Sequence, residues 1–543
     1  MASRTWYSSL GSLLPPETPG VVRLILATLS GAILSLSFRD AHSSFYSWFC
    51  LALLLLSFLN ARTGVAFFCG FLHGLIFVLT CVPWIAVVLS VHGGMSTTAG
   101  WGVLLLIASV WGCSIGLYTW MVVRLSRQGI LLALIGAPFL WISTEVLRAY
   151  LPEISFPWGL LGYPAAGNPV LVQLTTITGI YGVSFLVAAV NSLLVWVIVA
   201  DPPNKKSRLA TAAAVVVVLL AVIDFGPRFV PKAEARHIAR VVQPNFPETE
   251  GYVGDWYADH KQDLADLAQL SLRPTSGAQK PDLLIWPEAP APFSFQDPHF
   301  GPYISHLATE FQNPVIVGVI DWKPILDSSQ RVPRTGLVPY NSAALLNPLG
   351  QQIFLYDKIH LVPFGEYEPF PLIHQVVTSV SEEVGGFRKG KSRNVGKFPN
   401  GYTFSVFICY EAIYAGEIRE FAHNGAQLLI NISNDGWFGH SEAAEQHIRM
   451  ARVRAVENRR WLVRDTNSGI TASIDPYGNE LRVMQRDTRD SADVPYDFRG
   501  DQTIYSRFGD WFAWMCVGVS AILVLLTFRK ANDPRAAGSK ISA

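Results

Sequence analysis

Three polar residues, each closing an apolar run, have the side chains needed for acyl transfer. They are Glu288 at the end of PDLLIWPE, Lys358 at the end of GQQIFLYDK and Cys409 at the end of YTFSVFIC. A cysteine thiolate is a strong nucleophile, and a neighbouring cation lowers the pKa of a thiol. A carboxylate can take the thiol proton and later deprotonate an incoming nucleophile. An ammonium, helped by backbone N–H groups after Cys409, can stabilise the oxyanion of a tetrahedral intermediate, so the three residues brought together would make an acyl-transfer site.

Each of these residues also has an ordinary explanation. A cysteine at a strand end is often structural, and a single Glu or Lys often lies on the surface. Cys409 is the only cysteine between residues 231 and 509, so no second thiol is there to form a disulfide with it. In an oxidising compartment this favours a reactive thiol. The other five cysteines lie in apolar segments, where we interpret them as small packed hydrophobic residues: Cys50, Cys69, Cys81, Cys113 and Cys516.

The runs that end in these residues are predicted to be strands. A fourth run, AQLLINIS at 426–433, leads into the turn NDGWFG at 434–439. The stretch after Cys409 has helical spacing and closes with Asn-Gly, which is typical of a helix end. Alternating strands and helices indicate an α/β domain, in which ligand sites collect where the strands end.

Composition separates this domain from a second kind of region. Residues 21–200 carry nine charged side chains in 180 positions, whereas residues 231–510 carry 61 in 280, an ordinary density for a soluble domain. The chain is therefore not a single soluble protein, a disordered chain or a disulfide scaffold. With a net charge of +1, it is also not a nucleic-acid binder that relies on a large basic excess.

Eight apolar stretches approach the roughly 20 residues that a membrane-spanning helix requires. Seven precede the soluble domain and one follows it: 21–38, 44–60, 64–83, 98–123, 129–147, 172–200, 209–225 and 510–528. Two segments are ambiguous, because 64–90 could hold one long or two short helices and 150–172 could form a re-entrant loop. We expect a seven-span domain at 1–228, a catalytic domain at 229–509, and a last span with a cytoplasmic tail at 510–543.

Loop charges predict the orientation of the spans. With the N-terminus inside, the short cytoplasmic flanks hold twelve Lys and Arg residues, and the opposite short loops hold only Arg39 and Arg148. Because seven is an odd number of spans, residues 230–509 would then lie on the outer face. The Lys and Arg residues of this domain do not count against that orientation, since a long translocated domain is largely exempt from the charge rule.

Several longer motifs carry a resemblance to a known family. They are WPEAPAPF, YDKIHLVPFGEY, VFICYEAIY and NISNDGWFG, followed by QHIRMARVRAVENRRWLVRDTNSGITASIDPYG. In this order they resemble the carbon–nitrogen hydrolase (nitrilase) superfamily and, within it, the apolipoprotein N-acyltransferase branch, which carries a membrane domain. VVQPNFP at the start of the soluble domain and FPWGLLGY at 156–163 extend the resemblance over nearly the whole chain.

The resemblance implies a fold and roles for the site residues. The fold would be a multi-span α-helical membrane domain joined to an α/β nitrilase-like αββα sandwich. Glu288 would be the general base, Lys358 the oxyanion-stabilising lysine and Cys409 the nucleophile. Three more residues match the family's supporting positions: Glu366 in FGEY, and Tyr410 and Glu411 directly after the cysteine.

The implied reaction needs two lipid partners and no cofactor. A phospholipid would acylate Cys409, and the acyl chain would then pass to the α-amine of a lipoprotein's diacylglyceryl-cysteine. We expect a multi-pass monomer in the bacterial inner membrane, with its catalytic domain on the periplasmic face. The sequence has no metal-ligand spacing, so we expect no metal.

Other residues have less specific patterns. Trp256 resembles a tryptophan near the family's acyl pocket but could equally be a packing aromatic. Asn434, Asp435 and Trp437 could bind substrate or simply form a turn at a strand end. Asp465 stands where we expect a small residue, and we assign it no role.

Two apolar stretches flank the predicted site residues. Residues 290–300 and 369–380 could rest on the membrane and guide lipid tails, or they could pack on the domain's own core. Within the predicted spans, Glu145 and Arg148 have the spacing of a local ion pair.

Four functions compete on the sequence alone: a lipoprotein N-acyltransferase, a membrane-tethered amidase or nitrilase, an inactive scaffold and a transporter. The seven spans and the apolar stretches favour lipid substrates over a small soluble amide. An intact set of Glu288, Lys358 and Cys409 argues against a scaffold. The near absence of charge within the spans argues against a transporter.

Overall fold

The computed structural model divides the chain into two compact units. It describes residues 18–40, 42–151, 155–199, 202–247, 257, 260–275, 277, 279–289, 295–324, 336–363, 365–367 and 386–529. The first unit comprises Met1–Pro83, Gly102–Val230 and Asp510–Ala543, and the second comprises Trp84–Trp101 and Pro231–Gly509.

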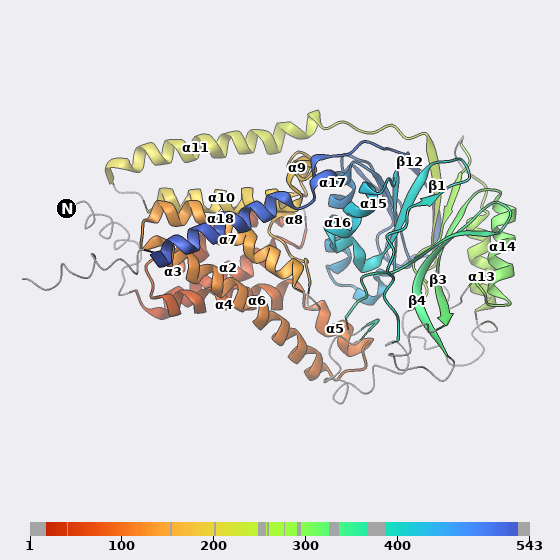
Figure 1. Ribbon diagram of the computed structural model, residues 1–543, viewed down its shortest axis with the longest axis horizontal. Helices are drawn as coiled ribbons and strands as arrows, with labels where there is room; N and C mark the ends of the chain where they lie inside the picture. The colour runs from red at the N-terminus through yellow and green to blue at the C-terminus, as the bar shows by residue number, and fades with distance from the viewer. Residues whose placement is uncertain are drawn as a thin grey trace, which may run out of the picture. The chain divides into compact units, whose positions relative to one another are not determined.

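Each of the eight apolar stretches contains a helix (Figure 1). The helices are α2 (Gly20–Leu36), α3 (Ser47–Phe58), α4 (Thr63–Cys81), α6 (Thr97–Ser126), α7 (Ile130–Tyr150), α10 (Ile180–Ile198), α11 (Pro202–Phe225) and α18 (Trp511–Arg529). Within the described part of the chain, six helices are long and apolar enough to cross a membrane, and the first two apolar helices are shorter.

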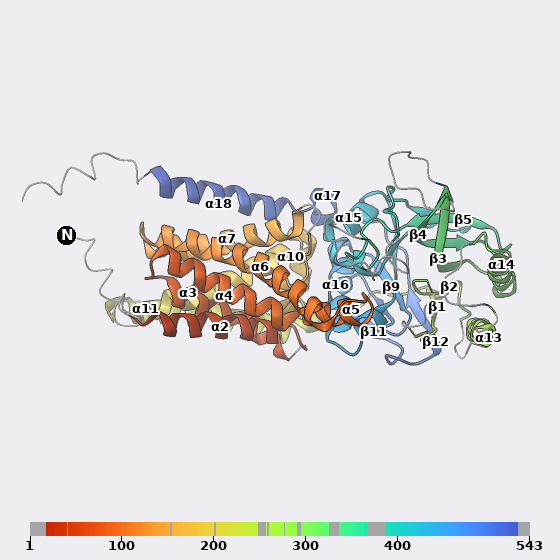
Figure 2. The ribbon, with the colours of Figure 1, turned by 90° about the horizontal axis from the view of Figure 1, so that it is seen from below.

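Small residues let the helices of this unit approach closely. Helices α2, α3 and α4 lie side by side (Figure 2). A Cβ atom at Gly31 of α2 would come within 2.4 Å of the His73 carbonyl oxygen of α4, so only glycine fits there. Gly70 of α4 meets the Ile115 carbonyl oxygen of α6 in the same way, again at 2.4 Å. Such contacts are how helices pack where lipid surrounds them.

The stretch expected as one span at 172–200 is broken. A 3-10 turn (Leu171–Leu174) and α9 (Thr175–Thr178) precede Gly179, and α10 begins after it. Gly179 has a φ of 64°, a left-handed conformation that glycine adopts without steric cost. The ambiguous stretch at 64–90 is two helices, α4 and α5 (Trp84–Val91).

The loop after α7 is tied to that helix by Glu145. This carboxylate accepts hydrogen bonds from the Trp141 indole N–H at 3.0 Å and from the Leu161 backbone N–H at 2.7 Å. It also lies 4.0 Å from the guanidinium of Arg148, which is the expected ion pair. Glu145 therefore holds the start of the short helix α8 (Gly162–Ala165) as well.

The second unit is built around two six-stranded sheets (Figure 1). Their strand orders are β12-β1-β2-β3-β4-β5 and β11-β10-β9-β8-β7-β6. The first sheet contains β12 (Asp490–Tyr496), β1 (His237–Gln243), β2 (Leu283–Ile285), β3 (Val315–Pro324), β4 (Leu337–Leu346) and β5 (Gln352–Asp357). The second contains β11 (Glu480–Arg482), β10 (Ala472–Ile474), β9 (Trp461–Thr466), β8 (Leu428–Ser433), β7 (Thr403–Ile408) and β6 (Gly396–Lys397).

Helices cover the outer faces of both sheets. The sheets contact each other through β1 with β9 and β4 with β7. Helices α13 (Lys261–Ser271) and α14 (Phe300–Phe311) pack on the first sheet. Helices α15 (Ala415–His423) and α16 (Ala443–Asn458) pack on the second. The result is the αββα sandwich that the resemblance implied.

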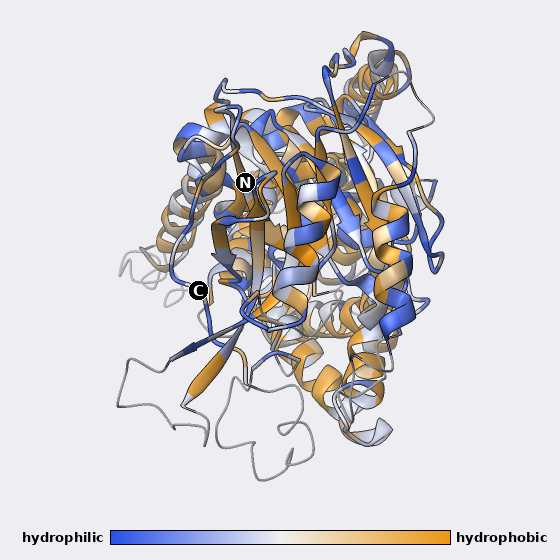
Figure 3. Cartoon of the chain, turned by 90° about the vertical axis from the view of Figure 1, so that its right-hand side faces the viewer, coloured by the Kyte–Doolittle hydropathy of each residue, from blue (hydrophilic) through white to orange (hydrophobic). Residues whose placement is uncertain are grey.

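Burial on both faces explains the continuous hydrophobic runs in the sequence. Every residue of β2 and β8 is buried, and Figure 3 shows hydrophobic strands beside helices of mixed character. Trp286 is fully buried after β2, where its indole N–H donates to the Ser271 hydroxyl at 2.9 Å. The four runs predicted as strands form β2, β5, β7 and β8.

Candidate active site

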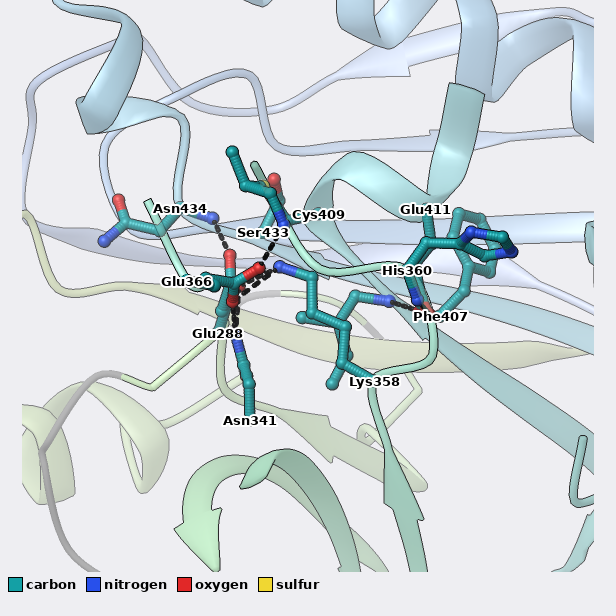
Figure 4. A network of polar contacts seen from close by, with 12 residues as sticks. Glu288, Asn341, Lys358, His360, Glu366, Phe407, Cys409, Glu411, Ser433 and Asn434 are labelled. Atoms are coloured by element: carbon teal, nitrogen blue, oxygen red, sulfur yellow. Dashed lines mark hydrogen bonds and ion pairs between the residues drawn. The ribbon is translucent and has the colours of Figure 1, made fainter. Parts of the chain in front are cut away.

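Strands from both sheets end at one cluster of polar residues (Figure 4). Glu288 follows β2 and Lys358 follows β5 in the first sheet, whereas Cys409 follows β7 and Asn434 follows β8 in the second. The cluster is closed to solvent, because Lys358 is 1%, Cys409 5% and Glu288 7% exposed. The structure therefore brings together the three residues that the sequence singled out.

Lys358 lies between two carboxylates. Its Nζ donates to Oε1 of Glu288 and to Oε1 of Glu366, each at 3.0 Å. Burial alone would lower the pKa of Lys358, but the two carboxylates outweigh burial, and the pKa is raised. The ammonium therefore stays charged, and a fixed cation in a dry site can stabilise a developing oxyanion.

Asn341 in β4 holds the same two carboxylates. Its Nδ2 donates to Oε1 of Glu288 and to Oε1 of Glu366, each at 2.7 Å. The backbone carbonyl oxygen of Asn341 also accepts a hydrogen bond from the backbone N–H of Lys358 at 2.8 Å. The sequence did not indicate Asn341, because a single Asn within a strand has no motif of its own; only the register of β4 against β5 reveals it.

Backbone N–H groups hold the remaining carboxylate oxygens. Asn434 N–H donates to Oε2 of Glu288 at 2.9 Å, and Val362 N–H donates to Oε2 of Glu366 at 2.8 Å. Glu288 thus accepts three hydrogen bonds from the described residues, and a carboxylate has about four lone-pair sites. One lone-pair position of the Glu288 carboxylate therefore remains to accept the proton of a nucleophile.

Cys409 has a strained backbone and an un-ionised thiol. Its φ is 49°, in the left-handed region that residues other than glycine rarely adopt. Burial, followed by the charge of Glu288, raises the pKa of the Cys409 thiol, and Lys358 opposes that rise without cancelling it. From the sequence we expect a neighbouring cation to lower the pKa of this thiol. Lys358 does lower it, but burial and Glu288 raise it by more, so the net pKa is raised. A neutral thiol reacts only when a neighbouring base takes its proton, and Glu288 is the carboxylate whose charge the thiol feels most.

Glu411 connects the loop after β5 to the turn that carries the cysteine. It accepts hydrogen bonds from the Tyr356 hydroxyl at 2.8 Å, from Ile359 N–H at 2.7 Å and from Ile408 N–H at 2.8 Å. Its side chain is fully buried, and burial raises its pKa. These partners flank Lys358 and Cys409, so Glu411 ties together the two segments that carry those residues.

Comparison with known proteins identifies the family. Residues 30–193 match the apolipoprotein N-acyltransferase N-terminal domain, and residues 238–496 match the carbon–nitrogen hydrolase family. The apolipoprotein N-acyltransferase of Geobacter metallireducens is 33% identical over 516 residues, which cover 94% of this chain and 96% of that relative. This chain belongs to the apolipoprotein N-acyltransferase family. The family member from Chlorobaculum tepidum is 29% identical over 539 residues, which cover 92% of this chain and 96% of that relative.

Solved amidases of the nitrilase superfamily also match this chain, at lower sequence identity. An amidase from Nesterenkonia sp. is 16% identical, with a TM-score of 0.34, over 51% of this chain and 94% of the amidase. Family membership and the apolar helices together make the chain a bacterial membrane acyltransferase of the carbon–nitrogen hydrolase superfamily.

The NDGWFG motif of this apolipoprotein N-acyltransferase family member forms a 3-10 turn, η6 (Asp435–Phe438). Asn434 Oδ1 accepts a hydrogen bond from Gly436 N–H at 3.3 Å, and the Asp435 side chain is fully buried against Arg464. The Trp437 ring lies 4.8 Å from the ring of His92, which follows α5. A role for Asn434, Asp435 and Trp437 in binding substrate stays a prediction.

The other predicted residues lie around the site or outside the described parts. Tyr410 is buried, and its hydroxyl accepts a hydrogen bond from the Tyr414 hydroxyl at 3.2 Å. Asp465 in β9 accepts a hydrogen bond from Val242 N–H of β1 at 3.2 Å, and burial raises its pKa well above the usual range. Trp256 and residues 290–294 and 369–380 fall outside the described residues. Among those described, no three His, Cys, Asp or Glu side chains are grouped as metal ligands.

Proposed function

We propose that this chain transfers a fatty acyl chain from a phospholipid to the N-terminal diacylglyceryl-cysteine amine of lipoproteins, through a thioester on Cys409. The observation that supports this most is the buried cluster of Glu288, Lys358 and Cys409 in a member of the apolipoprotein N-acyltransferase family. Two acyl transfers at a single thiol require a ping-pong order, in which the first product leaves before the second substrate reacts.

In the first half-reaction the phospholipid donates its acyl group. Glu288 takes the proton of Cys409, and the sulfur attacks the ester carbonyl. The Lys358 ammonium stabilises the negative charge that develops on the carbonyl oxygen. When the ester C–O bond breaks, Glu288 returns the proton to the departing glycerol oxygen, so a lysophospholipid leaves and the thioester remains.

In the second half-reaction the lipoprotein amine attacks the thioester. Glu288, again a carboxylate, removes a proton from the amine nitrogen as the new C–N bond forms. The C–S bond then breaks, and Glu288 returns the proton to sulfur. One base therefore serves both steps, and the enzyme ends in its starting state with a neutral thiol.

The remaining features of the proposal concern the membrane. We propose a monomer of the inner membrane, with spans in residues 1–228 and 510–543 and the catalytic residues 229–509 on the periplasmic face. The excess of twelve Lys and Arg residues over two in the short loops supports this orientation. The names of the relatives favour acyl transfer to a lipoprotein over the amidase alternative.

Intact-mass analysis after incubation with phospholipid tests the proposal. We expect purified full-length protein to gain the mass of one fatty acyl chain, on the peptide that contains Cys409, and to lose it in hydroxylamine. A protein that never gains this mass would contradict the thioester intermediate. Cys113→Ala is a matched control, because Cys113 is an exposed thiol in α6 and should not carry the acyl chain.

A further inference from the structure

A row of buried polar groups lies next to the nucleophile, and no step of the proposed reaction uses it. The side chains of Asp435, Arg464 and His447 have no exposed surface. Nη2 of Arg464 donates to the two oxygens of Asp435, at 2.8 and 2.7 Å, and lies 3.1 Å from Nδ1 of His447. Nε2 of His447, on α16, lies 2.9 Å from the carbonyl oxygen of Cys409.

The neighbours of His447 determine where its proton lies. A carbonyl oxygen only accepts, so Nε2 must carry a proton and donate it to Cys409. A guanidinium only donates, so Nδ1 accepts from Arg464. Oδ1 of Asp435 also lies 3.1 Å from Nδ1, and the Arg464 nitrogen donates to both atoms. Burial, followed by the charge of Arg464, lowers the pKa of His447, so the ring is neutral with its one proton on Nε2.

Asp435 keeps Arg464 in place. Burial alone would raise the pKa of Asp435, but the charge of the Arg464 guanidinium opposes burial, and the pKa lies well below its usual range. The carboxylate is therefore ionised at any ordinary pH. Nη1 of Arg464 also donates a hydrogen bond to the side-chain oxygen of Asn431 in β8, so Asp435 and Asn431 together fix the guanidinium.

The carbonyl that His447 holds belongs to the strained residue of the site. A non-glycine residue at a φ of 49° is strained, and this conformation persists only where the surrounding structure holds it. A hydrogen bond to the Cys409 oxygen fixes the plane of the following peptide and hence the ψ angle of Cys409. Together φ and ψ set the direction of the Cα–Cβ bond relative to the two flanking peptides. The thiol extends from that bond, so its position in the site depends on both angles.

We propose that His447 is a positioning residue, which aims the Cys409 thiol at the acyl carbonyl through the Nε2–H bond to the Cys409 oxygen, with Asp435 and Arg464 holding its tautomer. The proposal rests on the proposed function for its natural donor. A nucleophile displaced by about 1 Å can lose about 10²-fold in rate. The loss falls on acylation, which needs an aligned carbonyl, rather than on ionisation of the thiol.

Two variants of His447 separate the hydrogen bond from the packing. His447→Gln places an amide N–H at about the reach of Nε2, whereas His447→Asn reaches only the position of Nδ1. Both keep a polar side chain for Arg464. Phe438→Leu is the packing control. The Phe438 and His447 rings pack edge-to-face with their centroids 5.8 Å apart, and a phenyl ring cannot donate a hydrogen bond to the Cys409 oxygen.

Two reagents report on the thiol of each full-length variant. A p-nitrophenyl acyl ester measures acylation of Cys409 by release of nitrophenolate, whatever the natural donor is. Iodoacetamide, with mass mapping of the Cys409 peptide, measures the alkylation rate of the thiol. The sulfur attacks the methylene carbon of this reagent, so no carbonyl has to be aligned with it. We expect His447→Asn to lose about 10²-fold in acylation rate and much less in alkylation rate, and both His447→Gln and Phe438→Leu to stay within several-fold of the unmodified protein.

Three results would overturn the proposal: normal acylation by His447→Asn, an equal loss of acylation and alkylation in that variant, or an equal loss in Phe438→Leu. If His447→Asn fails to fold, His447→Phe gives the same comparison with the ring volume kept. Acylation of the unmodified protein by the ester but not by phospholipid would contradict the proposed function and leave the role of His447 to be decided by the same variants.

Discussion

Nζ of Lys358 lies 3.0 Å from Oε1 of Glu288, in a site that is almost closed to solvent. Asn341 donates to that same oxygen at 2.7 Å, so among the described residues Oε1 has two donors, whereas Oε2 has one, the Asn434 N–H. Oε2 is therefore the better acceptor for the Cys409 proton. The ion pair also keeps Lys358 charged, so in the proposed mechanism one contact serves both the base and the oxyanion.

Replacing Cys409 should abolish acyl-enzyme formation. We expect no acyl mass on Cys409→Ala, because the remaining thiols lie outside the cluster of Glu288 and Lys358. Cys409→Ser should be severely impaired, since a hydroxyl is far harder to ionise than a thiol. Intact mass and an unfolding temperature near that of the unmodified protein check both. Lipoprotein acylation by purified Cys409→Ala would disprove the nucleophile assignment.

Glu288→Gln and Lys358→Met should both block acylation of Cys409 but differ in stability. Loss of a general base costs about 10²–10⁴-fold in rate, and the glutamine keeps the shape of the side chain. Lys358→Met leaves the buried Glu288 and the half-buried Glu366 without their cation, which costs about 3–5 kcal/mol of unfolding free energy. The measurements are the rate of acyl-enzyme formation and denaturant unfolding in detergent. A normal acylation rate in either variant would remove that residue from the mechanism.

The raised pKa of Cys409 predicts an unusual pH profile for alkylation. Only the thiolate reacts, and below its pKa the thiolate fraction rises about tenfold per pH unit. Because burial and Glu288 raise the pKa above that of an ordinary thiol, the rate should rise from about pH 6 to about pH 9 without a plateau. Iodoacetamide labelling with mass mapping of the Cys409 peptide gives the profile. A plateau near neutral pH would show a lowered pKa instead, as expected of a thiolate dominated by Lys358.

The sequence predicted those parts of the site that follow strand ends. Glu288, Lys358 and Cys409 each close a buried run, and burial makes such runs recognisable without any knowledge of pairing. Because strands that end at one edge bring their last residues together, three distant positions could be placed in one site. The two six-stranded sheets and their covering helices agree with the αββα fold that the motifs implied.

Residues that act through pairing between distant segments could not be predicted in this way. Asn341 lies within β4 and reaches Glu288 only because β4 lies between β3 and β5. His447 meets the Cys409 oxygen across 38 positions of sequence, and Arg464 meets Asp435 across 29. The local sequence of each gives no sign of its partner, so these contacts required the structure.

Helix α5 lies in the unit of the sheets, and removing its first side chain should destabilise that unit. The Trp84 and Phe438 rings pack edge-to-face with their centroids 4.9 Å apart, and Trp84 is buried. Trp84→Ala should cost about 3–5 kcal/mol of unfolding free energy, as expected for a buried aromatic side chain. Val87→Ala on the same helix is the control, because Val87 is 51% exposed and should change stability by no more than about 0.5 kcal/mol. Equal effects of the two substitutions in denaturant unfolding would contradict a specific contact between α5 and the η6 turn.

Acyl transfer and hydrolysis can be separated by what discharges the thioester. With phospholipid alone, we expect the acyl-enzyme to persist and free fatty acid to appear slowly, because the buried site limits access of water to Cys409. A diacylated peptide with a free N-terminal cysteine amine should discharge the acyl group onto that amine, since Glu288 can deprotonate it. The same peptide with a blocked amine should not. Acyl-enzyme and fatty acid are followed together by mass spectrometry, with and without peptide. Rapid release of fatty acid that the peptide does not affect would favour an amidase-like hydrolase and contradict the proposed transfer.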